Sequence, residues 1–489
     1  MQDLCYHDRL EPWITKYGSP LNLLSAAPLK RNIRQLDRVA NERQLRFRVY
    51  FARKANKCLT LVDAAAEVDA GVDTASEVEL QQVLDRGFDP ARIICTAAVK
   101  SRHLMQQCVD AQVVVAVDNL DELHSLRAVA TTSRANAPIA LRISGFSHAG
   151  EKLPSRFGFD VDDLLSIVQE NWASSSDSPL AIRGIHFHLD GYCLQQRVSA
   201  IRQLLSIIDQ LRQWGHAIDF LDIGGGIPMS YLESAQQWEA FWTTHDDALL
   251  GNRSAITYQN HGLGRIAIGD QVHGERNVYP YYQQPVQHQW LERLLDSPLK
   301  DLAIDDLAVD DVAGNVTDAA AAGSSSLANA LRNRQLELRC EPGRSVLDGC
   351  GMTVARVEFR KQHPDGHWLI GLSMNRTQCR TTTDDFLVDP ILVRRQNSGV
   401  SSLPVSDDDA MEGYLVGAYC TESELLSLRR LRFPQGVSTG DLFVFPNTAG
   451  YLMHFLESRS HQFLLAKNGF VDGDAGSLSI DPIDQPIAQ

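Results

Sequence analysis

The sequence predicts an α/β protein with a (β/α)8 TIM-like barrel followed by a mostly β C-terminal domain. Eight short apolar stretches alternate with helical patterns over residues 47–340, as the parallel strands of such a barrel do. Glycines follow the seventh stretch and a charged turn follows the eighth, where these barrels bind phosphate. After residue 345 the helical patterns give way to alternating segments separated by turns, which indicates a second, β-rich domain.

The order of the predicted elements supports parallel strand pairing. The predicted strands cover residues 47–52, 72–75, 93–96, 113–117, 140–143, 184–188, 221–223 and 336–340. Helical spacing of apolar residues lies between them, for example at residues 59–66, 77–86, 120–130 and 200–214. A further helix is predicted at residues 28–44, ahead of the first barrel strand.

We expect three parts along the chain. Residues 1–40 form an N-terminal segment that packs on the β domain and contributes a strand to it, residues 41–345 form the barrel, and residues 346–489 form the β domain. The barrel is longer than the typical ~250 residues. Its surplus lies at residues 299–334, which are acidic and then rich in alanine and serine, so a disordered insertion is predicted there.

Composition excludes several classes of function. The chain has 489 residues, 44% hydrophobic and 22% charged, as in a globular protein. A formal net charge of -15 argues against a nucleic-acid partner. There is no apolar run of membrane-spanning length and no signal-peptide pattern, so the expected location is the cytoplasm. The nine cysteines are scattered without a CxxC pair, which predicts reduced thiols and no metal site.

Lys54 is the residue around which the predicted site is organised. The strand at residues 47–52 delivers it to the carboxyl end of the barrel, where such enzymes carry out their chemistry. In a dry barrel mouth we expect its pKa to fall, so that the free amine can form a Schiff base with a carbonyl cofactor. A single lysine after a strand is more often a solvated residue. The residues at the other strand ends therefore have to show whether Lys54 is catalytic.

Three other strand ends carry matching chemistry. Gly224, Gly225 and Gly226 follow the seventh predicted strand and could close backbone N–H groups around a phosphate. Glu341 follows the eighth and could keep a pyridine nitrogen protonated. His188 ends the sixth and could stack on an aromatic ring. Each alone is more often structural, but the combination is specific.

This combination resembles the fold-type III pyridoxal-phosphate enzymes, in particular the diaminopimelate and ornithine decarboxylase group with its alanine-racemase-like barrel. The resemblance covers most of the chain. In its length and in the residues of its motifs, the chain is also similar to a small bacterial group of decarboxylase-like proteins, the Y4yA-type group. The motifs are Ala-Arg-Lys-Ala-Asn at 52–56, Gly-Val-Asp-Thr-Ala-Ser at 71–76, Val-Asp-Asn-Leu-Asp-Glu-Leu at 117–123, Ser-Arg-Phe-Gly at 155–158, Gly-Ile-His-Phe-His at 184–188, Leu-Asp-Ile-Gly-Gly-Gly at 221–226, Glu-Pro-Gly-Arg at 341–344 and Gly-Ala-Tyr-Cys at 417–420.

The resemblance implies pyridoxal 5'-phosphate as cofactor and a homodimer with shared active sites. It makes Cys420 the residue that reaches into the neighbouring subunit and returns a proton after carbon dioxide leaves. The implied cofactor contacts are Lys54 as the Schiff-base lysine, His188 on the ring, Glu341 on the pyridine nitrogen, Gly224, Gly225, Gly226 and Gly343 around the phosphate, Arg344 near the phosphate and the substrate carboxylate, and Tyr451 closing over the phosphate.

The chain departs from the family pattern at substrate positions. Asp190-Gly191 replaces a Gly-Ser pair. Thr421 replaces the acidic residue that commonly follows the cysteine, which leaves Glu422 or Glu424 as candidate substitutes. Asp389 stands where diaminopimelate enzymes carry an arginine before a proline. We therefore expect an amino-acid substrate with a basic or uncharged distal group, bound by Arg344, Asp389 and Glu422.

Three functions are compatible with these residues. The first is an α-decarboxylase, in which Glu341 keeps the ring an electron sink. The second is an amino-acid racemase or epimerase, against which Glu341 argues because racemases of this barrel present an arginine to the pyridine nitrogen. The third is a non-catalytic decarboxylase-like binding protein, against which the intact Lys54, Glu341 and Cys420 argue.

Overall fold

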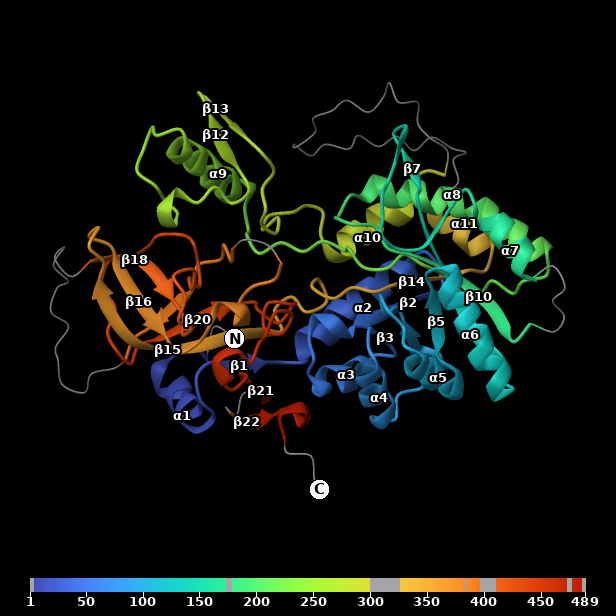
Figure 1. The fold of residues 1–489 in the computed structure, drawn as a ribbon, viewed down its shortest axis with the longest axis horizontal. Coiled ribbons are helices and arrows are strands. Elements are labelled where there is room, and N and C mark those ends of the chain that lie inside the picture. Colours follow the sequence, from blue (N-terminus) through green and yellow to red (C-terminus); the bar gives the residue numbers. More distant parts are fainter. Residues whose placement is uncertain are drawn as a thin grey trace.

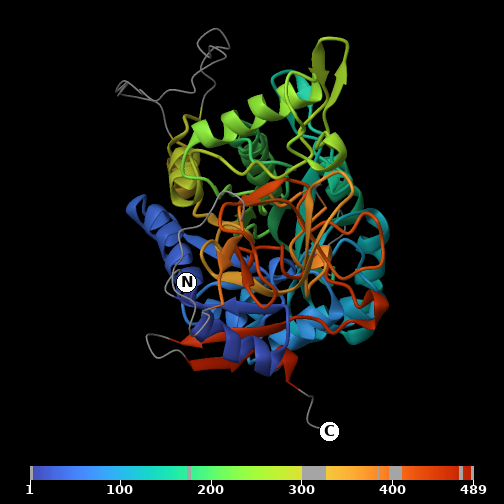
Figure 2. The ribbon, with the colours of Figure 1, turned by 90° about the vertical axis from the view of Figure 1, so that its left-hand side faces the viewer.

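The chain folds into a barrel and a β domain that lie side by side (Figure 1). The computed structural model describes residues 4–172, 178–299, 326–382, 385–395, 410–472 and 477–485. Figure 2 views the molecule from the side of the β domain, with the barrel behind it. Among the helices in these ranges, none combines the length and the apolar character that crossing a membrane would require.

Eight parallel strands close the barrel. Strand β10 pairs with both β6 and β11, and β14 pairs with β2, so the sheet has no open edge between these strands. All eight predicted strands are confirmed, with ends that differ by a few residues. They are β2 (Phe47–Ala52), β3 (Gly71–Thr74), β4 (Ile93–Cys95), β5 (Val114–Val117), β6 (Ala137–Ser144), β10 (Leu180–Phe187), β11 (Phe220–Asp222) and β14 (Glu337–Cys340).

Helices cover the outside of this barrel (Figure 1). Several begin at side-chain caps: Ser76, Ser101 and Asn119 each accept a backbone N–H of the first helical turn, which satisfies donors that a helix start leaves unpaired. Three short strands, β7 (Ser147–His148), β8 (Glu151–Lys152) and β9 (Phe159–Asp160), follow β6. The helices are α2 (Ala27–Glu42), α3 (Leu59–Ala66), α4 (Glu77–Asp85), α5 (Arg102–Ala111), α6 (Leu120–Ser133), α7 (Leu164–Trp172), α8 (Leu194–Gln213), α10 (Gln287–Asp296) and α11 (Leu327–Asn333).

Two predicted boundaries need correction. The insertion expected at residues 299–334 ends earlier, because α11 is ordered and buries Leu327 and Leu331 in the barrel core. Residues 300–325 lie outside the described part of the chain. Helix α2 also packs in the barrel core, so a division of the chain at residue 40 would cut through this helix.

The β domain is built on a long strand, β15 (Gly351–Gln362). Strand β1 (Leu21–Leu24), from the first 40 residues, lies between β15 and β21 in the same sheet, antiparallel to the first and parallel to the second. Helix α1 (His7–Tyr17) packs its apolar face against these strands. The other strands are β16 (Trp368–Leu372), β17 (Ile391–Val393), β18 (Met411–Val416), β19 (Leu431–Phe433), β20 (Leu442–Pro446), β21 (Lys467–Asp472) and β22 (Ser477–Ile480).

The segment between β11 and α10 leaves the barrel and packs on the β domain. It carries α9 (Ala235–Leu249) and the hairpin of β12 (Ile266–Ile268) and β13 (Gln271–His273), which project at the top of Figure 1. Trp238, Trp242 and Tyr281 share one apolar cluster with Phe386 and Phe445 of the β domain. This segment therefore joins the two bodies next to the carboxyl ends of the barrel strands.

Candidate active site

A cavity of about 380 Å³ opens at the carboxyl ends of the barrel strands. Both bodies line it, because Tyr451, Phe455, Thr381 and Thr382 come from the β domain. Of the predicted cofactor-binding residues, only Gly224 does not line this cavity. Those that do are Lys54, His188, Gly225, Gly226, Glu341, Gly343, Arg344 and Tyr451.

Lys54 lies in a short 3-10 turn directly after β2 and faces Asp73. Its Nζ is 3.3 Å from Oδ2 of Asp73, which lies on β3 with its side chain fully buried. The attraction of this carboxylate raises the pKa of Lys54 above its ordinary value. The expectation that the pKa of Lys54 falls is therefore wrong for the protein alone, because an anion on the neighbouring strand outweighs desolvation of the amine.

Tyr451 is hydrogen-bonded to the same turn. Its N–H donates to the carbonyl of Ala55 over 2.8 Å. Its φ of +70° lies in the left-handed region, which is rare for an aromatic residue and marks a position held by its surroundings. A Cβ at Gly343 would lie 2.7 Å from the Cβ of Ala55 and 2.8 Å from the Tyr451 hydroxyl, so only glycine lets these three segments meet.

The loops after β10 and β11 are bonded to each other. Gly225 N–H donates to Nδ1 of His188 over 3.2 Å, and Gly224 N–H donates to Oδ1 of Asp222 over 2.9 Å. Burial lowers the pKa of His188 to about 3, so its imidazole is neutral and suited to stacking on a ring. The N–H groups of Gly226 and Gly343 donate no hydrogen bond within the described part of the chain, which leaves them available to a phosphate.

Arg344 is held at the cavity wall by tyrosines. Its Nη1 donates to the hydroxyl of Tyr231 over 2.9 Å and to the carbonyl of Gly450 over 3.2 Å. The guanidinium carbon lies 4.2 Å from the ring centre of Tyr279 and 5.2 Å from that of Tyr451. These contacts fix a cation beside Gly226 and Gly343 in the cavity wall.

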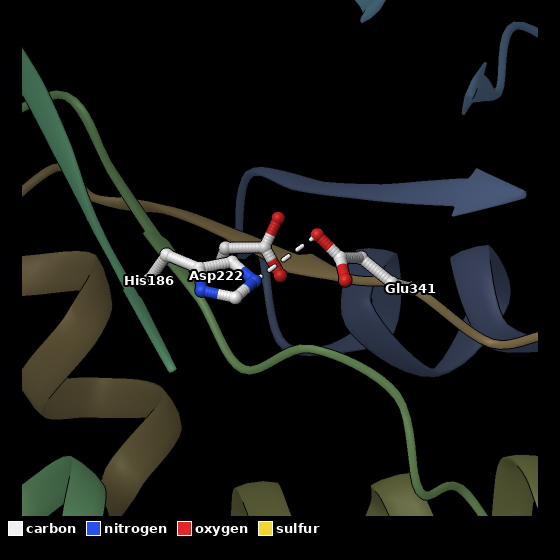
Figure 3. Close-up of side chains that lie close together, drawn as sticks. All are labelled: His186, Asp222 and Glu341. Atoms are coloured by element: carbon white, nitrogen blue, oxygen red, sulfur yellow. Dashed lines mark ion pairs between the residues drawn. The ribbon is translucent and has the colours of Figure 1, made fainter. Parts of the chain in front are cut away.

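Glu341 belongs to a buried cluster with His186 and Asp222 (Figure 3). Nε2 of His186 is 3.2 Å from Oε1 of Glu341, yet the two are not aligned as a hydrogen bond, and this buried Oε1 has no donor. Burial raises the pKa of both carboxyls and lowers that of the imidazole. Such a donor set could also hold a metal ion, but Glu341 lines the cavity, so a metal there would compete with a cofactor ring.

Of the predicted substrate and proton-transfer residues, Arg344 lines this cavity, and Asp389, Glu422 and Cys420 do not. Asp389 is 77% exposed and forms a surface ion pair with Arg429 at 2.6 Å. Glu422 lines a different cavity, of about 530 Å³. Glu424 is buried and accepts the N–H of Arg376 over 2.9 Å. Asp389 and Glu422 therefore lie away from the cavity of the same subunit, and their contact with a substrate stays a prediction; Cys420 is exposed and lies outside this cavity as well.

Other residues line the cavity that the sequence did not single out. Thr381 and Thr382 precede the strand β17 by several residues, and Tyr279 comes from the segment between β11 and α10. No sequence pattern links them to the strand ends, because the docking of the two bodies brings them there. Tyr192 is different, since it follows His188 by four residues and could have been found in that loop.

The cavity fits pyridoxal phosphate by its own chemistry. It offers a lysine for the aldehyde, a neutral imidazole for the ring and a buried carboxylate oxygen that lacks a donor, as the pyridine nitrogen would supply. It also offers two glycine N–H groups and an arginine for the phosphate. Lys54, His188, Glu341, Gly226, Gly343 and Arg344 would hold the cofactor.

Comparisons with known proteins agree with this chemistry. Residues 29–249 match the family described as pyridoxal-dependent decarboxylase, pyridoxal binding domain. The chain is 29% identical over 459 residues to uncharacterized protein y4yA of Sinorhizobium fredii, which covers 94% of this chain and 88% of that protein. It is 29% identical over 230 residues to diaminopimelate decarboxylase of Pseudomonas aeruginosa, which covers 45% of this chain and 54% of that enzyme. The second match thus spans about half of the relative's length.

The solved structures extend the likeness to the whole fold. Diaminopimelate decarboxylase from Helicobacter pylori, complexed with L-lysine, aligns with a TM-score of 0.65 over 96% of this chain and 95% of that one, at 17% sequence identity. At this identity the likeness shows the fold, a barrel followed by a β domain.

Proposed function

We propose that this chain, whose residues 29–249 match the pyridoxal-binding domain of pyridoxal-dependent decarboxylases, removes the α-carboxylate of an amino acid as carbon dioxide. The observation that carries this proposal is Glu341. It is a buried carboxyl group, 3% exposed, with an oxygen that lacks a donor, in the same cavity as Lys54. A carboxylate in this place keeps a pyridine nitrogen protonated, which favours the full electron sink that decarboxylation needs.

Pyridoxal phosphate, when bound, supplies the electron sink that stabilises the charge left on the α-carbon. In our proposal Lys54 binds the cofactor carbonyl, His188 packs on the ring and Glu341 holds the proton at the pyridine nitrogen. His186 and Asp222 lie beside Glu341 in this buried cluster. Tyr451 closes the cavity and excludes water from the side of the β domain.

Asp73 has a separate part in this proposal. Lys54 must lose a proton before its amine can bond to a carbonyl. Asp73 Oδ2 lies 3.3 Å from Nζ, and burial raises the pKa of the Asp73 carboxyl. We therefore propose that Asp73 sets the pH at which Lys54 loses this proton.

The substrate we propose has a basic or uncharged distal group. Apart from Lys54 and Arg344, no lysine or arginine of the described chain lines the cavity, so a second carboxylate would lack a partner in this subunit. The remaining wall is largely apolar, with Leu189, Val278 and Phe455, and carries one further acid, Asp190, at its exposed edge. An anionic distal group would meet no cation there and would pay the desolvation of its charge.

We also propose a homodimer in which Cys420 serves the neighbouring cavity. Phe455 lines the cavity and is 47% exposed, and Leu464 is 88% exposed. Next to Cys420 in sequence, Tyr419 stacks on His461 at 5.1 Å and on Phe463 at 6.1 Å between ring centres. Exposed apolar groups of this kind mark interaction surfaces, and a second copy seated on them would bring its own Cys420 toward the cavity.

The first experiment tests covalent attachment of the cofactor. Wild type, Lys54→Ala and Lys57→Ala are incubated with pyridoxal phosphate and borohydride and then analysed by peptide mass spectrometry. Lys57 is a matched control, because it lies three residues away and forms an ion pair with Glu457. We expect label on Lys54 in the wild type and in Lys57→Ala, and none in Lys54→Ala.

The second experiment tests the reaction. Carbon dioxide release and optical rotation are followed with a panel of L- and D-amino acids. Release of carbon dioxide from a basic or uncharged amino acid supports the proposal. Loss of optical rotation without carbon dioxide would establish a racemase instead, and neither activity in a protein that carries the label on Lys54 would favour a binding protein.

A further inference from the structure

Arg197 is a fully buried arginine on α8, next to the candidate active site. It is 0% exposed, and no carboxylate among the described residues forms an ion pair with it. Its partners are main-chain carbonyl groups. Nη1 donates to Cys193 over 3.1 Å, and Nη2 lies 2.8 Å from the oxygen of Gly191, 3.2 Å from that of Leu189 and 3.4 Å from that of Gly225.

These carbonyl groups belong to two different loops. Leu189 and Gly191 follow His188 in the loop after β10, whereas Gly225 lies in the loop after β11. One guanidinium therefore joins the loop of His188 to the loop of Gly224–Gly226. The latter loop, predicted to bind the phosphate, is called the phosphate cradle below. The guanidinium also touches the back of the cradle, because a Cβ at Gly226 would lie 1.9 Å from Nη2.

No carboxylate of the described chain forms a direct ion pair with Arg197, although the charge of Asp190 acts on it from a greater distance. Its guanidinium carbon lies 5.5 Å from the ring centre of Trp290 on α10, and its Nε has no hydrogen-bond partner. Burial lowers the pKa of Arg197 to about 10, so the side chain is still a cation at neutral pH. A buried cation without a direct ion pair is unfavourable, and Gly226, against which Arg197 packs, lines the cavity.

We propose that Arg197 is a positioning residue for the phosphate group of pyridoxal phosphate. It ties together the two loops that form the cradle, and its charge attracts the phosphate dianion from behind Gly226. The dianion in turn supplies the missing counter-ion. This inference rests on the cofactor and not on the proposed reaction, so its test contains no amino-acid substrate.

The test compares a ligand that carries the phosphate with one that does not. Dissociation constants of pyridoxal phosphate and of pyridoxal are measured by fluorescence for cofactor-free wild type, Arg197→Met, Arg197→Lys and Arg212→Met. Arg212 is the matched control, because it lies near the other end of α8 and also donates to carbonyl groups, those of Ile218 at 3.0 Å and Arg334 at 2.6 Å.

We expect Arg197→Met to raise the dissociation constant of pyridoxal phosphate about tenfold or more, and to change that of pyridoxal less than about threefold. Arg197→Lys retains the charge and should keep most of the preference for pyridoxal phosphate over pyridoxal. Arg212→Met should leave both dissociation constants unchanged. Equal weakening of the two ligands would show a merely structural role and overturn the proposal, as would no change. If Arg197→Met does not fold, a loss of the preference in Arg197→Lys overturns it.

Discussion

At the scale of single residues, we expect the pairing of Lys54 with Asp73 to set the pH at which the proposed attachment of the cofactor can occur. The carboxylate stabilises the ammonium form of Lys54 and raises its pKa, so the free amine is scarce at neutral pH. Attachment should therefore require either higher pH or transfer of the proton to Asp73.

Replacement of Asp73 by Asn should move this requirement to lower pH. Without the neighbouring anion the pKa of Lys54 falls, and we expect the pH midpoint of borohydride-trapped attachment to drop by about one unit or more. Asp190→Asn, at the edge of the same cavity, is the control and should leave the midpoint in place. A midpoint that stays or rises in Asp73→Asn would contradict the role given to this ion pair.

Asp37 on α2 offers a test of stability far from the cavity. Burial and the nearby charge of Asp69 raise the pKa of Asp37 from 3.8 to about 6. Between these two values the folded protein keeps a proton that the unfolded chain has released, so stability is lost as pH rises through this window.

Asp37→Asn removes this loss because an amide does not ionise. Relative to wild type, we expect the variant to gain about 2 kcal/mol more in the free energy of unfolding at pH 7 than at pH 4.5, measured by urea unfolding. Asp69→Asn should give a smaller pH-dependent gain in the same direction, because it removes the like charge near Asp37 and also the ion pairs of Asp69 with Arg48 and Arg92. An equal gain at both pH values would show that ionisation of Asp37 is not the cause.

The residues that sequence could identify are those fixed by a strand end. Lys54, His188, Gly226 and Glu341 each follow a barrel strand within four residues, so the topology of the barrel brings them together. Their charge states could not be predicted. The effect of Asp73 on the pKa of Lys54 depends on a distance of 3.3 Å between side chains of neighbouring strands, which no sequence pattern encodes.

At the scale of elements, the loop after β11 is shaped by what packs behind it. Gly226 has a φ of +80°, and an added Cβ would meet Arg197 at 1.9 Å and the carbonyl oxygen of Gly191 at 2.8 Å. Gly251, after α9, has a φ of +78° with no atom within 4 Å of an added Cβ. The two glycines thus share backbone strain and differ only in crowding.

Alanine at these two positions separates the two effects. We expect Gly251→Ala to cost about 1 kcal/mol of stability, from strain alone, with unchanged affinity for pyridoxal phosphate. Gly226→Ala should in addition lower the affinity for pyridoxal phosphate about tenfold or more, because the loop has to move away from Arg197. Thermal unfolding and cofactor titration measure both, and equal cofactor affinity in the two variants would refute this account.

The barrel elements were predictable and the added segment was not. Apolar strands that alternate with helices leave a strong pattern, and all eight strands follow it. The segment with α9 and the β12–β13 hairpin buries Trp238 and Trp242 on the β domain, a surface that the sequence does not reveal. The end of the expected insertion was misplaced for a similar reason, because α11 is short and is ordered by burial in the barrel core.

At the scale of the whole molecule, a shared site predicts complementation between inactive variants. If Cys420 serves the neighbouring cavity, Lys54→Ala and Cys420→Ala are each inactive alone. In a mixed dimer one of the two cavities has both residues. Random exchange makes about half of the dimers mixed, so we expect about a quarter of wild-type carbon dioxide release. Mixtures that stay at the level of the single variants would exclude a shared site.

The position of β1 has a consequence for how the protein is made. This strand is synthesised before the barrel, but its neighbours in the sheet are β15 and β21, which are synthesised after the whole barrel. The barrel can therefore close before β1 has a strand to pair with. Until then Leu21 and Leu23, which are buried in the folded protein, are exposed to solvent. During this interval the nascent chain carries an unpaired apolar strand, and assistance by chaperones would matter most there.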